Sequence, residues 1–208
     1  MANNGKPRTV YWLENKLYLN LTNKCPNNCF FCIRNYRTGI AEFNLKLQTE
    51  PTIETVIAEL QEALHMRNWK EIVFCGFGEP TQRLDMILEV TKWLRQHHCT
   101  FPIRVNTNGL GNKLNPGPQV VKEMKAAGIT KISISLNAQN ETVYNEICKP
   151  KLENSYKAII EFINQAKQEI ETEVTAITTP EINLHEVEQL AKQMGVKFRI
   201  RQYTPYFY

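Results

Sequence analysis

The chain has 208 residues, a hydrophobic content of 42%, a charged content of 22% and a formal net charge of +4. This composition is ordinary for a soluble globular protein, and so mild a charge gives no ground to infer a nucleic-acid partner. The first residues contain no apolar signal core and no stretch reaches the length of a membrane span, so a cytoplasmic protein without membrane contact is expected. The length fits one domain over residues 1–208.

The first predicted elements form a hairpin. Strand-like runs over 10–13 and 16–21 are separated by Glu14 and Asn15, and residues 1–15 are expected to be an N-terminal extension that carries the first run. From there strands and helices alternate. Further strands are expected over 71–74, 103–105, 131–136, 173–178 and 197–203, and helices over 51–64, 84–94, 118–127, 154–168 and 184–194.

This alternation predicts an α/β fold made of parallel βα units with right-handed crossovers. Counted from Lys16, the chain offers six parallel strands with five intervening helices. Six units cannot close an eight-stranded barrel, so the expected architecture is an open, partial (βα)6-type barrel preceded by the short hairpin.

The predicted interior of this barrel is polar. Apolar residues alternate with Ser133 and Ser135 in one strand, and with Arg199 and Arg201 in the last strand. An ordinary eight-stranded barrel fills its interior with branched apolar side chains. A polar inner face therefore favours a binding cavity.

Three of the six cysteines lie within eight residues, at Cys25, Cys29 and Cys32. No fourth cysteine or histidine follows closely, whereas structural zinc sites and electron-carrier clusters use four ligands. Three thiolates can hold three corners of a 4Fe-4S cluster and leave the fourth iron open. Cysteines clustered in this way also fit a reducing cytoplasm better than a disulfide scaffold.

The Cys-x3-Cys-x2-Cys run resembles the motif of the radical S-adenosylmethionine (SAM) superfamily, down to the aromatic Phe31 before the third cysteine. The resemblance implies that SAM binds the open iron, with Phe31 among the cofactor-binding residues. An electron from an external flavodoxin- or ferredoxin-like donor then cleaves SAM to methionine and a 5′-deoxyadenosyl radical, which abstracts hydrogen from a substrate. Residues 33–50, which lack apolar periodicity, are expected to form an exposed loop around the cluster.

A glycine motif follows the strand over 71–74. Gly76, Phe77, Gly78 and Glu79 lie in a run that resembles the superfamily's Gly-Gly-Glu-Pro motif, with Phe77 in place of the first glycine. Glycine lets the backbone approach a ligand closely. The resemblance implies that the backbone from Cys75 to Gly78, together with Glu79, binds the SAM amino group. A plain glycine turn is the alternative.

Polar residues also follow the next two strands. Asn106 and Asn108 lie in a run that resembles the superfamily's Thr-Asn-Gly motif, and Ser135 with Asn137 resembles its Ser-Leu-Asp segment. The resemblance implies contacts with the SAM ribose and carboxylate. Asn137 stands where aspartate is common, and an amide can still donate to and accept from hydroxyl groups. Turn formation or a solvated strand end is the alternative for each.

Substrate residues are expected at the last strand. Arg199 and Arg201 could clamp a carboxylate or phosphate in two-point fashion, within an aromatic edge formed by Tyr203, Tyr206, Phe207 and Tyr208. The alternative is that Glu173 pairs with one arginine and the tyrosines cap the barrel end. Arg34, in the loop after the cysteines, is a further candidate for contact with substrate or reductant.

Cys148 is predicted to lie in the loop after the fourth parallel strand, on the side of the predicted active site. A catalytic thiol there could donate a hydrogen atom or bind an auxiliary metal. The alternative is an inert cysteine.

Within the superfamily, the Leu-Asn-Leu-Thr-Asn-Lys-Cys opening, the Cys-Lys-Pro run and the Arg-x-Tyr end resemble the small TatD-associated radical SAM proteins. The name of that group carries no substrate. The 7-carboxy-7-deazaguanine synthases are similar in size, but Ile33 and Arg34 stand where they have Asp-Thr. Open functions are an enzyme acting on a small anionic or nucleotide-like molecule, an activase or modifier of a protein or RNA, and a non-catalytic metal-binding module. The absence of an appended domain favours the small substrate.

Overall fold

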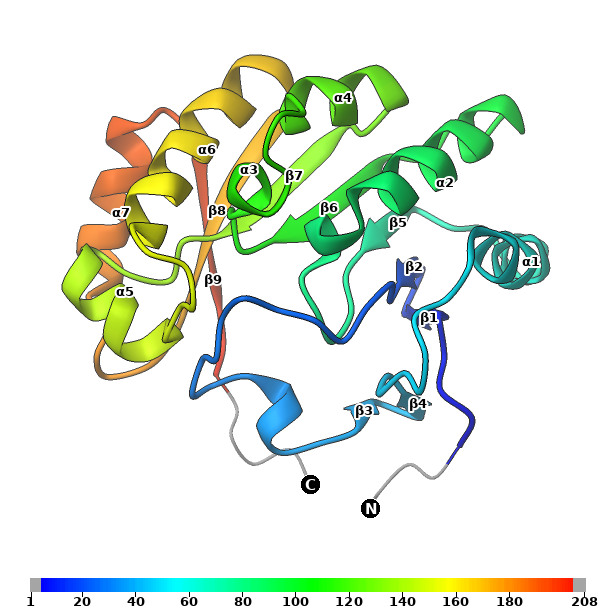
Figure 1. Ribbon diagram of the computed structural model, residues 1–208, viewed down its shortest axis with the longest axis horizontal. Coiled ribbons are helices and arrows are strands. Elements are labelled where there is room, and N and C mark those ends of the chain that lie inside the picture. Colours follow the sequence, from blue (N-terminus) through cyan, green and yellow to red (C-terminus); the bar gives the residue numbers. More distant parts are fainter. Residues whose placement is uncertain (1–4, 204–208) are drawn as a thin grey trace.

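The computed structural model describes residues 5–203, in which one curved sheet carries helices along its outer face (Figure 1). The sheet has seven strands in the order β1-β2-β5-β6-β7-β8-β9. β1 pairs antiparallel with β2, and all other neighbours are parallel. The strands are Val10–Leu13 (β1), Lys16–Leu19 (β2), Glu71–Phe74 (β5), Ile103–Thr107 (β6), Lys131–Ser135 (β7), Glu171–Ile177 (β8) and Lys197–Arg201 (β9). This topology confirms the predicted α/β partial barrel with its N-terminal hairpin.

Helices α2, α4, α6 and α7 cover the outer face of the sheet, and the segment between β2 and α1 lies on the opposite side (Figure 1). No helix within residues 5–203 is long and apolar enough to cross a membrane. The helices are Ile53–Leu64 (α1), Leu84–Gln96 (α2), Gly111–Leu114 (α3), Val120–Ala127 (α4), Glu141–Cys148 (α5), Ser155–Glu169 (α6) and Leu184–Gln193 (α7), with 3-10 turns at Ile33–Asn35 (η1) and Pro80–Arg83 (η2).

Several helix ends follow from local capping chemistry. α1 begins after Thr52, whose side chain accepts a hydrogen bond from the Thr55 N–H, and Asn183 accepts from Glu186 in the same way before α7. α4 ends at Gly128, whose φ of +112° is a left-handed conformation that glycine adopts without a Cβ clash. The sequence therefore predicts these ends well.

The two faces of the sheet differ in polarity as predicted. Ile134 and Val174 are fully buried in the apolar core under the helices. Ser133 and Ser135 face the interior, where both lie within hydrogen-bond distance of arginines from β9. The predicted phase of the inner strands is confirmed.

Residues 33–50 are more ordered than predicted, since they include the hairpin of β3 (Gly39–Ile40) and β4 (Phe43–Asn44). Phe43 and Leu45 are buried in a second apolar cluster with Tyr11 and Phe77. The expectation of an exposed loop is wrong for this part of the segment. Apolar residues alternate with polar ones from residue 43 to residue 47, a strand period too short to stand out from loop sequence.

Cys148 is also placed differently from the prediction. It is the last residue of α5 and is fully buried, so it is not a loop residue. Asn140 caps this helix, and Tyr144 and Ile147 bury its apolar face. α4 is equally short, but Gly128 marks its end, whereas α5 ends at Lys149, which gives no comparable sequence signal. Tyr206, Phe207 and Tyr208, predicted to extend the edge of the last strand, lie outside the described residues.

Candidate functional site

The cysteine loop, residues 25–32, follows β2 and is held against the end of α5. The backbone N–H groups of Asn28 and Phe30 donate to carbonyl oxygens at the end of that helix, at 3.0 and 3.2 Å. The Asn27 side chain donates to the Tyr144 hydroxyl at 2.8 Å. The shape of the loop therefore depends on α5.

Cys25, Cys29 and Cys32 are half-buried free thiols. Burial raises the pKa of Cys25 to about 12, and a hydrogen bond with the Cys148 thiol, together with burial, raises the pKa of Cys29. Arg34 Nε donates to Cys32 Sγ at 3.2 Å. Thiols that hold their protons this firmly lose them when a metal binds, because metal binding displaces protons from its ligands.

The three thiols of the cysteine loop form a donor set that a cluster can use. Among residues 5–203 no three His, Cys, Asp or Glu side chains converge closely enough to hold one metal ion. Ligands at three corners of a cubic cluster lie farther apart than the ligands of one ion, because each binds a different iron. Three soft thiolate donors on one loop therefore fit a 4Fe-4S cluster.

The glycine motif packs tightly beside the cysteine loop. A Cβ on Gly76 would collide with the Asn20 side chain, and a Cβ on Gly78 would collide with the Lys24 carbonyl. Asn20 Oδ1 also accepts a hydrogen bond from the Phe77 N–H at 3.0 Å. The two glycines thus let the chain after β5 lie directly against the chain that enters the cysteine loop.

Two side chains of the glycine motif, Phe77 and Glu79, are buried and make their contacts within the protein. Phe77 is buried against Tyr11 in the second apolar cluster. Glu79 is buried and accepts hydrogen bonds at 2.7 Å from the Thr107 hydroxyl and from the Asn108 N–H. Burial raises the pKa of Glu79, and these hydrogen bonds oppose that rise. Glu79 therefore ties the glycine motif to the end of β6.

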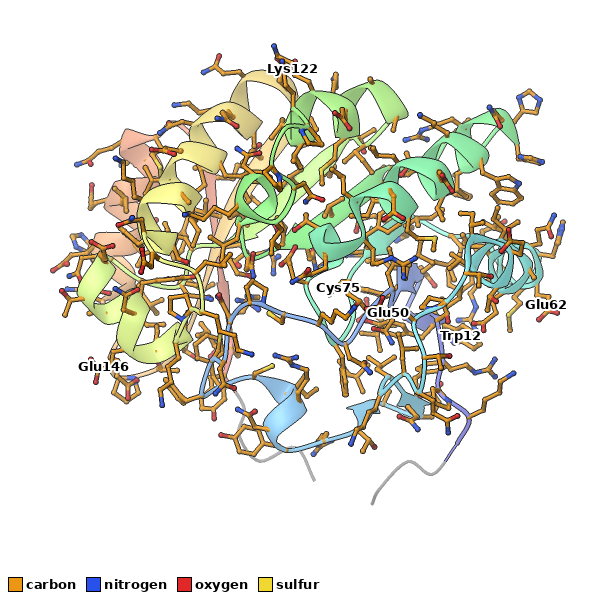
Figure 2. The ribbon with its side chains drawn as sticks, in the orientation of Figure 1. Trp12, Glu50, Glu62, Cys75, Lys122 and Glu146 are labelled. Carbon is orange, nitrogen blue, oxygen red and sulfur yellow. The ribbon has the colours of Figure 1, made fainter. Side chains whose placement is uncertain are left out.

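The predicted pair at the end of β6, Asn106 within the strand and Asn108 after it, divides between two places. Asn108 lies at the cysteine loop, with Nδ2 3.9 Å from Cys25 Sγ. Asn106 points into the barrel, where its Oδ1 accepts a 2.7 Å hydrogen bond from Arg104. Cys75 lies where the chain leaves β5 (Figure 2), and its thiol hydrogen-bonds with Asn106. Of this pair, Asn108 is the one that adjoins the predicted cluster.

Ser135 and Asn137 connect the end of β7 to β9 and α5. Arg201 Nη2 donates to Asn137 Oδ1 at 3.0 Å and lies 3.4 Å from Ser135 Oγ. Asn137 Nδ2 lies 3.8 Å from Cys148 Sγ. Asn137 has a φ of +60°, a left-handed conformation that asparagine tolerates better than most residues. The Asn137 side chain thus contacts Cys148 of α5 on one side and Arg201 inside the barrel on the other.

A cavity of about 550 Å³, here called the lumen, enters the barrel from the amino ends of the strands, where Lys16, Glu71 and Lys131 begin β2, β5 and β7. It is lined mainly by charged side chains. Within it Arg199 pairs with Glu173 at 2.7 Å, and Arg104 pairs with Glu71 at 2.9 Å. Pairing of one C-terminal arginine with Glu173, the alternative drawn from the sequence, is therefore what the structure shows for Arg199. Arg201 also lines the lumen.

The other predicted contact residues lie around the cysteine loop. Tyr203 packs edge-to-face on Phe30, with ring centroids 6.2 Å apart, and Phe30 packs on Phe31 at 5.3 Å. Arg34 also donates from Nη1 to the Asn23 carbonyl at 2.9 Å. These contacts place Tyr203, Phe31 and Arg34 at the loop itself.

Two residues that shape the site, Asn20 and Tyr144, are not among those predicted for it. Asn20 directly follows β2, between Leu19 and Leu21, and a lone amide between apolar neighbours is the signal that marks it. Tyr144 meets Asn27 across 117 positions, so no local pattern indicates that contact.

The family model described as "Radical SAM superfamily" matches residues 19–194. The chain belongs to the radical SAM superfamily. Members of this family are enzymes that use a 4Fe-4S cluster and SAM, so the predicted superfamily, enzyme class and cofactors are confirmed. The finer resemblance to TatD-associated proteins stays a prediction.

The chain is 28% identical over 131 residues to the GTP 3′,8-cyclase of Paenarthrobacter nicotinovorans, which covers 63% of this chain and 34% of that protein. It is 28% identical over 192 residues to the probable GTP 3′,8-cyclase of Thermoplasma volcanium, covering 91% and 53%. It is 26% identical over 193 residues to a probable dual-specificity RNA methyltransferase, RlmN 1, of Protochlamydia amoebophila, covering 87% and 51%. The chain thus spans about a third to about half of the length of these relatives.

Two solved structures show the same fold at low identity. Streptococcus suis SuiB bound to S-adenosylmethionine has a TM-score of 0.69 at 14% identity, covering 92% of this chain and 41% of that chain. Methylornithine synthase (PylB) has a TM-score of 0.64 at 16% identity, covering 91% and 53%. Both likenesses support the partial barrel.

Proposed function

We propose that Cys25, Cys29 and Cys32 hold a 4Fe-4S cluster with one open iron, and that this chain reductively cleaves SAM to abstract hydrogen from a small, anionic or nucleotide-like substrate. One observation carries the proposal. The cysteine loop meets the glycine motif and the end of β6 at the carboxyl edge of the parallel strands, and Cys148 of α5 joins Cys29 to Asn137 after β7. The charged lumen enters from the amino ends of the strands, and Asn106 and Arg201 line it nearest to that edge. That edge is where parallel α/β folds bind ligands.

The bound cluster and SAM would supply the 5′-deoxyadenosyl radical, and the protein supplies binding and position. The backbone from Cys75 to Gly78 is proposed to accept the SAM amino group, in a shape that Glu79 and Asn20 fix by hydrogen bonds. Asn108 lies next to Cys25 of the cysteine loop, and Asn137 lies next to Cys148 of α5, which is hydrogen-bonded to Cys29. These two amides are the proposed contacts for the SAM ribose and carboxylate.

A small substrate is favoured over a macromolecule because the charged groups lie inside the barrel, in a cavity of about 550 Å³. Relatives named GTP 3′,8-cyclase act on GTP, which makes a nucleotide the first probe. An RNA substrate, suggested by the relative named RNA methyltransferase, is the second candidate.

An external flavodoxin- or ferredoxin-like protein is the proposed electron donor. Among the described residues, Cys75, Cys99 and Cys148 stand singly in the sequence, and no second cysteine motif offers a relay cluster.

The test uses anaerobically reconstituted protein, reduced with dithionite and mixed with SAM. Iron, sulfide and 5′-deoxyadenosine are measured in wild type, in Cys29→Ala and in Cys99→Ala, which removes a half-buried thiol outside the loop. The proposal predicts about four irons per chain and deoxyadenosine formation, both lost in Cys29→Ala and retained in Cys99→Ala. Zinc in place of iron, with no SAM cleavage, would contradict it and leave a metal-binding module.

A further inference from the structure

Three arginines line the lumen, and of these three only Arg201 has no carboxylate partner among the described residues. The Arg104 guanidinium donates to both Glu71 oxygens, at 2.9 and 3.0 Å. Arg199 Nη2 donates to a Glu173 oxygen at 2.7 Å. These two pairs neutralise their arginines within the lumen itself.

Arg201 also has an unused donor. Its Nη2 reaches only neutral groups, Asn137 Oδ1 at 3.0 Å and Ser135 Oγ at 3.4 Å. Its Nε is buried and has no hydrogen-bond partner within residues 5–203. Burial lowers the pKa of this guanidinium, yet arginine remains protonated in proteins. A buried cation with an unpaired donor is unfavourable unless a partner supplies the missing charge and acceptor.

The lumen as a whole has an excess of positive charge. Six lysine and arginine side chains line it against three glutamates. A concave surface with this imbalance attracts anions. The charge that Arg201 lacks is therefore one that a ligand of the lumen can bring.

We propose that Arg201 binds an oxyanion, a carboxylate or a phosphate, of the ligand that occupies the lumen. The inference rests on the proposed function and names the group by which a ligand is held. A guanidinium presents a planar fork that can donate to two oxygens of one oxyanion. Because Arg201 contacts Ser135 and Asn137, that oxyanion would lie on the lumen side of the proposed cofactor contacts. Its source is either the SAM carboxylate or an anionic group of the substrate.

The test compares reconstituted wild type with Arg201→Met and with Arg199→Met, whose guanidinium is already taken by Glu173. SAM, inorganic pyrophosphate, citrate and GTP are separate probes, with binding measured by equilibrium dialysis and thermal unfolding in low-salt buffer. At least one probe should bind wild type and lose about tenfold or more of its affinity in Arg201→Met, with a smaller loss in Arg199→Met. Without ligand, Arg201→Met should unfold no lower than wild type, because the change removes an unpaired buried cation.

A loss confined to SAM assigns the oxyanion to the SAM carboxylate, and a loss confined to the other probes assigns it to the substrate. If every probe binds Arg201→Met as it binds wild type, the proposal is overturned. 5′-Deoxyadenosine is measured in parallel. If 5′-deoxyadenosine forms but no probe shows Arg201-dependent binding, this inference is overturned and the proposed function stands. If a probe shows Arg201-dependent binding but no 5′-deoxyadenosine forms, the proposed function is overturned and the oxyanion site stands.

Discussion

Asn27 Nδ2 lies 2.8 Å from the Tyr144 hydroxyl, and this buried hydrogen bond joins the cysteine loop to α5 across 117 positions of sequence. Asn27 lies two residues after Cys25, and Tyr144 lies four residues before Cys148. One contact therefore couples the loop that carries the predicted cluster ligands to a helix outside the strands of the barrel.

Tyr144→Phe is expected to lower the free energy of unfolding by about 1–3 kcal/mol, because the buried Asn27 amide loses its acceptor. The cysteine loop should then release iron faster. Chemical denaturation and the rate of iron transfer to a chelator measure the two effects. Tyr156→Phe, which removes a hydroxyl bonded to the Ala138 carbonyl, should keep the wild-type rate of iron release. Equal rates in both variants would count against the coupling.

Glu79→Gln is expected to weaken SAM binding by about tenfold, equivalent to about 1.4 kcal/mol. Thr107 and Asn108 donate to different oxygens of the carboxylate, and glutamine keeps only one accepting oxygen, so one of the two hydrogen bonds is lost and the tie between the glycine motif and β6 is weakened. Equilibrium dialysis with SAM measures the change. Glu89→Gln, at an exposed position of α2, is the matched control. Unchanged affinity in Glu79→Gln would exclude a positioning role for this carboxylate.

Gly76→Ala is expected to abolish SAM binding and to destabilise the protein by about 1–3 kcal/mol, because the added Cβ collides with Asn20. At Gly117 nothing lies within 4 Å of the position that a Cβ would take, and only its φ of +102° opposes substitution. Gly117→Ala should therefore cost about 1–2 kcal/mol and leave SAM binding intact. Dialysis and urea unfolding separate the two effects, and SAM binding by Gly76→Ala would contradict the close approach.

Arg199→Met is expected to destabilise the protein most at neutral pH. Burial opposes ionisation of Glu173, but hydrogen bonds from Arg199 and Ser133 outweigh it and lower the pKa of that carboxyl. A carboxylate of this kind adds stability that is present above its unfolded pKa, about 4.3, and is lost as the pH falls through the lower folded value. The loss should be about 1 kcal/mol at pH 7, reduced by solvent screening because the Arg199 side chain is 46% exposed.

The difference between Arg199→Met and wild type should shrink as the pH falls below about 4, where Glu173 becomes protonated in both. Urea unfolding of both proteins at pH 7 and at a pH below about 4 measures this difference in the free energy of unfolding. Lys197→Met, which removes an exposed partner of Glu171, should change stability little at either pH. A difference that grows in acid would show that Arg199 acts through something other than Glu173.

The polar interior could be predicted from sequence because the side-chain period of a strand is two. Ser133, Arg199 and Arg201 all alternate with apolar neighbours, and the structure places all three inside. The different environments of the two arginines could not be predicted. The register between β8 and β9 sets these environments. Glu173 on β8 lies within reach of Arg199, whereas no carboxylate in the described residues lies within reach of Arg201.

Local periodicity also has a lower limit of length. The β3–β4 hairpin escapes prediction because it offers only a few apolar positions. α5 escapes because no glycine marks its end, as Gly128 marks the end of the equally short α4, and tertiary packing stabilises it. The role of α5 as a support for the cysteine loop depends on Asn27 and Tyr144, whose contact is visible only in three dimensions. Motifs with fixed spacing, such as Cys25, Cys29 and Cys32, are the features most readily predicted from the sequence.

Electron paramagnetic resonance of the dithionite-reduced protein, recorded before and after addition of SAM, tests the central claim most directly. A cluster held by Cys25, Cys29 and Cys32 with one open iron predicts a reduced 4Fe-4S signal that changes when SAM binds. The change should persist in Cys99→Ala, and the signal should be lost in Cys29→Ala. A 4Fe-4S signal that SAM leaves unaltered, or a protein that retains its signal without Cys29, would contradict the account.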